Sequence, residues 1–323
     1  MATKLYPWQK EVWSQWQQLI EKDRLPHAIL CAMPDGVGRD RLAQYFADTL
    51  VCLTQGTEPC GFCHSCGLIE SGNHPDLHWI RPEVEGKSIS VDQIRQCNQW
   101  ALESSQFNAK RVIIIDPAEK MTESAANALL KTLEAPPKNC HFVLLASSPH
   151  KLLPTVRSRC QVWHQPSIPV PVIRDWLMET EQLDVTQQSI IINGYSPLLV
   201  RGYYQDKKVI QHKQLLAEFA VYADSYFTNI SGILPLLVKL GDEGLCWLSY
   251  LLSDIQKVQL GVGTNLVHCD ELTYVQKHAI KLNADLVYKQ YLSLNELRQQ
   301  LNSHPGLNKE LLITQWLFEF IGA

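Results

Sequence analysis

The stretch HAILCAMPDGVGRDRLAQYFADTL, residues 27–50, contains the segments that decide the fold class. The segment formed by residues 27–31 is short and apolar, which is typical of a buried strand. A turn that contains two glycines follows over residues 33–39. Beyond this turn, Leu42 and Phe46 lie at helical spacing within an apolar pattern. The stretch therefore predicts a strand, a glycine-containing loop and a helix.

Other apolar segments predict further strands of the same sheet, over residues 111–116, 141–147 and 161–164. The first of them carries β-branched residues on both faces, as central parallel strands do. A helix is expected over residues 122–134, where Ala and Leu are frequent, and Pro136 stops it. Strands that alternate with helices predict a parallel sheet covered on both faces.

Length and composition favour more than one domain. The chain has 323 residues, of which 46% are hydrophobic, and about 100–200 residues per domain gives two or three domains. A proline-punctuated segment at residues 166–171 precedes a leucine-rich part without clear strand signals. We predict an α/β domain over residues 1–166, a small helical domain over 167–207 and a larger helical domain over 208–323.

Charge and hydropathy argue against membrane-spanning, secreted and strongly nucleic-acid-binding classes of protein. No run approaches the ~18 apolar residues of a membrane span, and the N-terminal MATKLYPW lacks the layout of a secretory signal. We expect a soluble, cytoplasmic protein with no membrane partner. Residues 1–166 carry 17 basic and 17 acidic side chains, which argues against tight autonomous binding to a phosphate backbone.

The loop over residues 33–40, MPDGVGRD, partly follows the phosphate-binding pattern G-x-x-x-x-G-K-[ST]. Gly36 and Gly38 suit such a loop, but Met33 replaces the first glycine of the pattern, Arg39 replaces the lysine and Asp40 replaces the hydroxyl residue that holds Mg²⁺. A carboxylate at that position adds negative charge beside a triphosphate. Taken alone, the loop is either an ordinary strand–helix turn or a nucleotide site that has lost its chemistry.

Asp116 favours the second interpretation. It ends a predicted strand where the Mg²⁺-associated carboxylate of a nucleotide site would lie, but Pro117 follows in place of the acid that would polarise water. Glu119 lies three residues further on and is expected to point elsewhere. We therefore predict a degenerate nucleotide site that neither binds ATP productively nor hydrolyses it.

A dense cysteine cluster predicts a metal site. Cys60, Cys63 and Cys66 follow a C-x2-C-x2-C pattern, and Cys52 lies upstream. In a reducing compartment such a cluster indicates a metal rather than disulfides. A structural Zn²⁺ takes four tetrahedral N or S ligands; His64 competes with Cys52 for the fourth position, and we favour Cys52. The alternative is a set of free buried thiols.

These segments, in this order, resemble the delta-prime family of bacterial DNA polymerase III clamp-loader subunits, which are AAA+ proteins. The resemblance is carried by the four cysteines and by residues 25–30, 33–40, 127–137 and 155–160. It spans residues 1–166 well, and the remainder agrees in length and layout. It implies an AAA+ domain with a zinc knuckle at residues 52–66, a small helical lid and an all-α collar that joins subunits.

The resemblance also implies a site residue. In the family, the Ser-Arg-Cys triplet carries an arginine finger, which maps onto Arg159, with Arg157 as the nearby alternative. The residues alone favour an ion pair between Arg159 and an Asp of its own domain, whereas the resemblance favours the finger. A guanidinium is always charged and can bind the γ-phosphate of a nucleotide held by an adjacent subunit. The sensor arginine of the ATPase relatives corresponds here to Leu198.

The family implies a hetero-oligomeric partner set. Its members assemble with gamma or tau ATPase subunits and with delta, and the complex places a sliding clamp on primer-template DNA. The losses at Arg39, Asp40 and Pro117 separate this chain from gamma and tau. The resemblance thus implies a rigid stator of the polymerase holoenzyme that has no ATPase activity of its own.

Two other functions stay open at this point. One is an active ATPase subunit like gamma or tau, which would turn over ATP by itself. The other is a zinc-dependent nucleic-acid-binding module, which would bind DNA with strong salt dependence.

Overall fold

The computed structural model describes residues 4–84, 86–107, 110–304 and 306–322. The chain forms two compact units, Met1–Val172 and Ile173–Ala323, which are described separately. The boundary lies close to the predicted end of the α/β domain at residue 166.

The first unit contains a five-stranded parallel sheet with the order β2-β3-β4-β1-β5. The strands are β1 (Ala28–Ala32), β2 (Leu77–Ile80), β3 (Arg111–Ile115), β4 (Cys140–Ala146) and β5 (Gln161–His164). Four of them confirm the predicted strands within a residue or two. The edge strand β2 was not predicted, because its sequence Leu-His-Trp-Ile interrupts the apolar run with a histidine.

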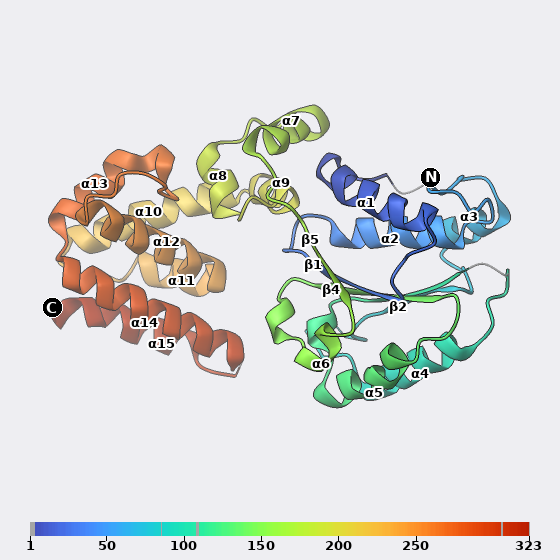
Figure 1. Cartoon of the computed structure of the whole chain (residues 1–323). Coiled ribbons are helices and arrows are strands. Elements are labelled where there is room, and N and C mark those ends of the chain that lie inside the picture. Colours follow the sequence, from blue (N-terminus) through green and yellow to red (C-terminus); the bar gives the residue numbers. More distant parts are fainter. Residues whose placement is uncertain (1–3, 85, 108–109, 305, 323) are drawn as a thin grey trace. The chain divides into compact units, whose positions relative to one another are not determined.

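Helices cover both faces of this sheet, as predicted (Figure 1). One face packs against α4 (Val91–Leu102) and α5 (Glu123–Glu134), whose apolar side chains share a buried core with β1, β3 and β4. The other side carries α1 (Lys10–Glu21) and α2 (Arg39–Val51). Here the centroid of the buried Trp16 ring lies 5.0 Å from the centroid of the Phe46 ring and 5.8 Å from that of the Trp163 ring.

Local sequence signals explain where the covering helices begin. Thr122 caps α5, because its hydroxyl accepts the backbone N–H of Ala125. Ser90 and Gln93 form a capping box at the start of α4. Shorter helical segments of this unit are η1 (Pro7–Gln9), α3 (His64–Glu70), η2 (Ala118–Lys120), η3 (Pro149–Lys151) and α6 (Pro154–Arg157).

The described residues of the second unit form helices and no strands. They are α7 (Val170–Glu181), α8 (Gln187–Ile192), α9 (Pro197–Gln205), α10 (Lys208–Asp224), α11 (Ile233–Leu240), α12 (Asp242–Gln259), η4 (Cys269–Glu271), α13 (Leu272–Lys281), α14 (Ala284–Ser303), α15 (Lys309–Phe318) and η5 (Glu319–Gly322). The central helix α12 packs against both α13 and α14. None of the helices in the described part of the chain is long and apolar enough to pass through a membrane.

The predicted lid and collar share one hydrophobic core. Tyr203 of α9 is buried together with Leu215 of α10 and Trp247 of α12, and the Tyr203 and Trp247 rings meet edge to face at 5.9 Å. These helices all lie within the second compact unit. A separate lid over residues 167–207 stays a prediction.

Candidate phosphate loop, arginine finger and metal centre

The loop between β1 and α2 has the backbone of a glycine-rich turn. Gly36 and Gly38 adopt positive φ angles of 77° and 75°, which L side chains rarely adopt. A Cβ added at Gly38 would lie 2.5 Å from Cε2 of the Tyr6 ring. Glycine is therefore required at residue 38 by both conformation and space.

Two side chains of the N-terminal segment fasten this loop. The indole N–H of Trp8 donates to the Val37 carbonyl at 2.9 Å. The amide of Gln9 donates to the Gly38 carbonyl at 2.6 Å and to the Val37 carbonyl at 3.2 Å. This role is not visible in the sequence, because nothing near residues 8 and 9 indicates a partner almost thirty residues away.

Arg39 lies across the loop instead of pointing freely to solvent. Its Nη1 atom lies 2.7 Å from Oδ1 of Asp35 and donates to the Met33 carbonyl at 3.2 Å. Its Nε atom lies 3.9 Å from Oδ1 of Asp116. The Arg39 side chain is only 14% exposed, and its guanidinium is engaged by two carboxylates and one carbonyl group of its own chain.

Asp116 is held by two arginines. Besides Arg39, the Nη2 atom of Arg81 lies 3.4 Å from Oδ2 of Asp116, and the Arg81 guanidinium lies 4.1 Å from the centroid of the Trp79 ring. Burial raises the pKa of Asp116, against the opposing effect of both arginines. Arg81 follows the strand β2 that the sequence did not predict, so its place beside Asp116 could not be foreseen.

The other acidic side chains near the loop lie apart from this ion-pair group. Asp40 is exposed in the first turn of α2, where a negative charge suits the helix N-terminus. Glu119 points away, as expected: its Oε1 accepts the N–H and O–H of Ser147, at 2.9 and 2.8 Å, and the N–H of Ser148 at 3.2 Å. Burial raises the pKa of Glu119, but these hydrogen bonds outweigh it and the net shift is downward.

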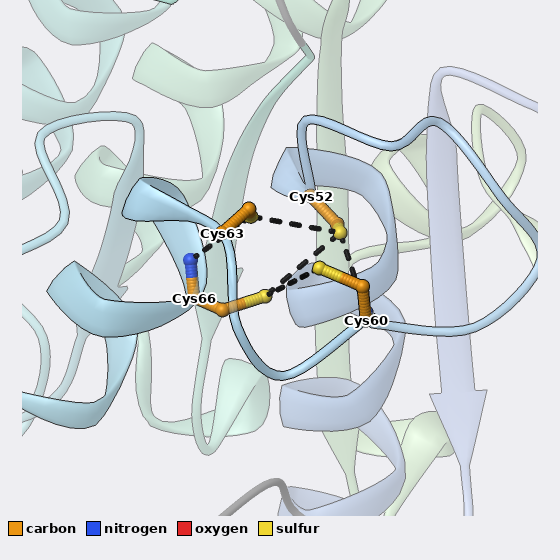
Figure 2. A group of neighbouring side chains, drawn as sticks. All are labelled: Cys52, Cys60, Cys63 and Cys66. Carbon is orange, nitrogen blue, oxygen red and sulfur yellow. Dashed lines mark hydrogen bonds between the residues drawn. The ribbon is translucent and has the colours of Figure 1, made fainter.

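The four cysteines converge on one point, although they come from different elements (Figure 2). Cys52 directly follows α2, Cys60 lies in the following loop, Cys63 caps α3 and Cys66 lies in the first turn of α3. The sulfur–sulfur distances are 3.9 Å for Cys52–Cys63, 3.9 Å for Cys60–Cys66 and 3.8 Å for Cys52–Cys66. All four atoms lie within 4.8 Å of one another.

These distances suit a metal ion and not a disulfide. A tetrahedron with metal–sulfur bonds of about 2.3 Å has edges of about 3.8 Å, whereas two disulfide sulfurs are separated by about 2.05 Å. The ring of His64 instead meets Phe107 edge to face, with centroids 5.7 Å apart, and His64 is outside the group of convergent ligand atoms. The structure thus brings Cys52, and not His64, to the other three thiols.

Backbone N–H groups donate hydrogen bonds to some of these sulfurs, which favours the negatively charged thiolate form. The N–H of Cys60 donates to Sγ of Cys52 at 3.4 Å, and that of Cys66 donates to Sγ of Cys63 at 3.5 Å. A hydrogen bond from the Phe62 backbone is the largest cause that lowers the pKa of Cys60 to about 6. Burial raises the pKa of Cys66 to about 12.

Arg159 lies in the turn between α6 and β5. Its Nη2 atom forms an ion pair with Oε1 of Glu134, and its Nη1 donates to the Thr155 carbonyl at 2.8 Å. The intradomain ion pair that the residues alone favour is therefore present, with a Glu rather than an Asp. Arg157 is exposed and its side chain has no hydrogen bond or ion pair to any residue in the described ranges. Leu198 lies in the first turn of α9 and is partly exposed.

Comparison with known protein families covers nearly the whole chain. The family model for "DNA polymerase III, delta subunit" matches residues 8–168, and that for "DNA polymerase III, delta subunit, C terminal" matches residues 207–322.

Individual relatives agree with these matches. DNA polymerase III subunit delta' of Haemophilus influenzae is 32% identical over 99% of this chain and 98% of its own. The same subunit of Yersinia pestis is also 32% identical, over 98% and 95%, and that of Escherichia coli is 29% identical over 97% and 94%. A solved structure of the Bacillus subtilis DNA clamp loader delta protein covers 97% of this chain and all of its own, with a TM-score of 0.36 and 13% identity, which is too remote to support any argument. From the family models and the sequence relatives, the chain belongs to the DNA polymerase III delta' subunit family.

Proposed function

We propose that this protein is a non-hydrolysing stator subunit of a bacterial replicative clamp loader, which completes the ATP site of a neighbouring subunit with Arg159. Its partners would be the gamma or tau ATPase subunits and delta. The assembled complex would place a sliding clamp on primer-template DNA. Membership of the delta' family supports the clamp-loader role. Two features of the first unit, the contacts of Arg39 and the partial exposure of Arg159, support the roles proposed for this chain and for its neighbour.

The contacts of Arg39 are the main observation in support of the proposal that the chain does not use ATP itself. A phosphate loop works because its lysine and backbone N–H groups are available to the phosphates. Here Arg39 is tied to Asp35, Asp116 and the Met33 carbonyl. A nucleotide would have to break these interactions, and it would also meet the carboxylate of Asp40 at the position of the Mg²⁺-binding hydroxyl.

Arg159 is suited to act on a nucleotide held by another subunit. Its guanidinium is partly exposed, with 32% of the side chain accessible, and it keeps its charge at every physiological pH. An arginine supplied in trans to the transferred phosphoryl group can be worth about 10³–10⁵ in rate. This chain would therefore affect catalysis without containing a nucleotide of its own.

We also propose that Cys52, Cys60, Cys63 and Cys66 hold a structural Zn²⁺. The spacing of the four sulfurs fits tetrahedral thiolate coordination. Four protein ligands leave no position for water, so the ion would supply folding energy and no reactivity.

The proposal is tested by ATP turnover in the isolated chain and in the assembled loader. The isolated chain should neither bind ATP·Mg²⁺ at micromolar affinity nor hydrolyse it. Arg159→Ala should leave folding and assembly intact but lower the DNA-stimulated kcat of the neighbouring ATPase at least about 10-fold, whereas Arg157→Ala should not.

Three results would overturn the assignment. Turnover by the isolated chain would identify an active ATPase subunit. Unchanged kcat in the Arg159→Ala complex would exclude the finger. Strongly salt-dependent DNA binding by the isolated chain would instead support a zinc-dependent nucleic-acid-binding module.

A further inference from the structure

Glu134 breaks a rule of helix electrostatics. It is the last residue of α5, and a carboxylate at a helix C-terminus meets the negative end of the helix dipole, which is unfavourable by a few tenths of a kcal/mol or more. Departures from such local rules are expected where a residue serves a site. The side chain is 55% exposed, so packing does not explain its presence.

The carboxylate of Glu134 compensates this unfavourable position by contacting Arg159. Oε1 of Glu134 accepts from Nη2 of Arg159, while the Thr155 carbonyl accepts from Nη1 at 2.8 Å. Both terminal nitrogens of the guanidinium are thus held by its own domain. An arginine has five N–H groups, so one hydrogen on each Nη and the Nε–H take no part in these two interactions.

The helix end that presents Glu134 is itself fixed. The preceding Leu133 is buried in the core between α5 and the sheet. The Nε2 atom of His27, directly before β1, hydrogen bonds to the Leu133 carbonyl at 3.0 Å. A side chain on a rigid element can set the orientation of a functional group more accurately than one on a free loop.

We propose that Glu134 is a positioning residue for Arg159, which orients the guanidinium so that its three remaining N–H groups face the nucleotide of the neighbouring subunit. This inference rests on the proposed function, because it assumes that Arg159 acts in trans. A free arginine side chain populates many rotamers. By restricting them before the partner binds, Glu134 lowers the entropy lost when the phosphoryl group is contacted.

The test measures kcat and KM for ATP in the loader assembled with full-length variants, with clamp and primed DNA present. Glu134→Ala should lower kcat about 5-fold, which is the upper range for an exposed ion pair, and should leave KM within about 2-fold. Glu134→Gln should retain most of the activity, because its amide oxygen still accepts from Nη2. An effect on kcat and not on KM is expected if the interaction matters in the transition state.

The double variant separates positioning from a general structural effect. In the Arg159→Ala background, Glu134→Ala should cause no further loss, because there is no guanidinium left to orient. Glu123→Ala is the matched control, since it removes an exposed carboxylate from the other end of the same helix and should leave kcat unchanged.

The outcomes test the arginine finger and the positioning role of Glu134 separately. If Arg159→Ala has no effect, the finger is excluded and the role of Glu134 with it. If Arg159→Ala lowers kcat but Glu134→Ala does not, or if the two losses multiply, the finger stands and the positioning role is overturned.

Discussion

Arg39 connects several parts of its surroundings through one side chain. A lysine ammonium is a compact point charge, whereas the arginine fork can contact several acceptors at once. In this chain the fork reaches Asp35, Asp116 and the Met33 carbonyl. The cation of this loop thus contacts acidic groups of its own chain.

The buried His141 makes stability depend on pH. Burial lowers the pKa of His141 to about 4, against the effect of its hydrogen bond to the Pro26 carbonyl at 3.0 Å. Its pKa in the unfolded chain is about 6.5, so the unfolded state binds more protons between these values. The stabilisation is present above pH 6.5 and is lost as the pH falls toward 4.

We predict that His141→Asn removes this dependence, because the Asn amide can still donate to Pro26 while it cannot titrate. Between pH 7.5 and 5.5, the loss of unfolding free energy should be smaller in the variant by about 1.4 kcal/mol. Urea denaturation at the two pH values measures the difference. The exposed His150 provides the control variant His150→Asn, and an identical pH dependence in wild type and His141→Asn would contradict the prediction.

At the scale of elements, the cysteine knuckle (residues 52–66) joins the end of α2 to the start of α3. Its cysteines are close in sequence, and the segment contains little apolar surface to bury: Phe62 is 83% exposed and Leu53 is 40% exposed. A metal cross-link would stabilise a segment of this kind. The four convergent sulfurs provide the ligands for one.

We predict that the purified protein contains about one Zn²⁺ per chain and that Cys63→Ser releases it. The variant should lose on the order of 10 kcal/mol of metal-linked folding energy, which is confined mainly to the knuckle. Metal analysis and limited proteolysis within residues 52–66 check both effects.

His64→Ala is the matched control for the cysteine substitution, because His64 lies within the same segment but outside the group of ligand atoms. It should retain the metal. Wild-type protein that is metal-free and equally resistant to protease would contradict the metal centre, and metal loss in His64→Ala would contradict the choice of Cys52.

At the scale of the whole molecule, each compact unit has a hydrophobic core of its own. One core cluster lies within residues 28–156 around the sheet, and the other lies within residues 192–320 among the helices. A domain with its own core can in principle fold alone. In the second core, Tyr203 of α9 is buried together with Leu215 of α10 and Trp247 of α12.

We predict that fragments 1–169 and 170–323 each fold independently. The division precedes α7, which begins at Val170, so no helix is interrupted. Each fragment should unfold cooperatively with a free energy of about 5–15 kcal/mol, as followed by circular dichroism in urea. By contrast, a fragment that starts at residue 208 should be less stable than 170–323, because it lacks Tyr203. A cooperative transition of equal stability in the shorter fragment would support a separate lid domain.

The sequence by itself determined the features that depend on neighbours along the chain. The apolar run of β1, the glycine-containing turn after it and the Ala- and Leu-rich run of α5 are each formed by residues close together in the chain, so they can be recognised in the sequence. The cysteine cluster belongs to this class, since its ligands fall within residues 52–66. The same local segments carried the family resemblance that the comparisons confirmed.

Only the tertiary structure decided which distant residues meet. The edge strand β2 carries a mixed pattern, and its role depends on pairing with β3, more than thirty residues further along. Trp8 and Gln9 reach the phosphate loop, Arg81 reaches Asp116, and Glu134 reaches Arg159 across 25 residues. No periodicity encodes such contacts, because they arise when packing the helices on the sheet brings the ends of separate elements together.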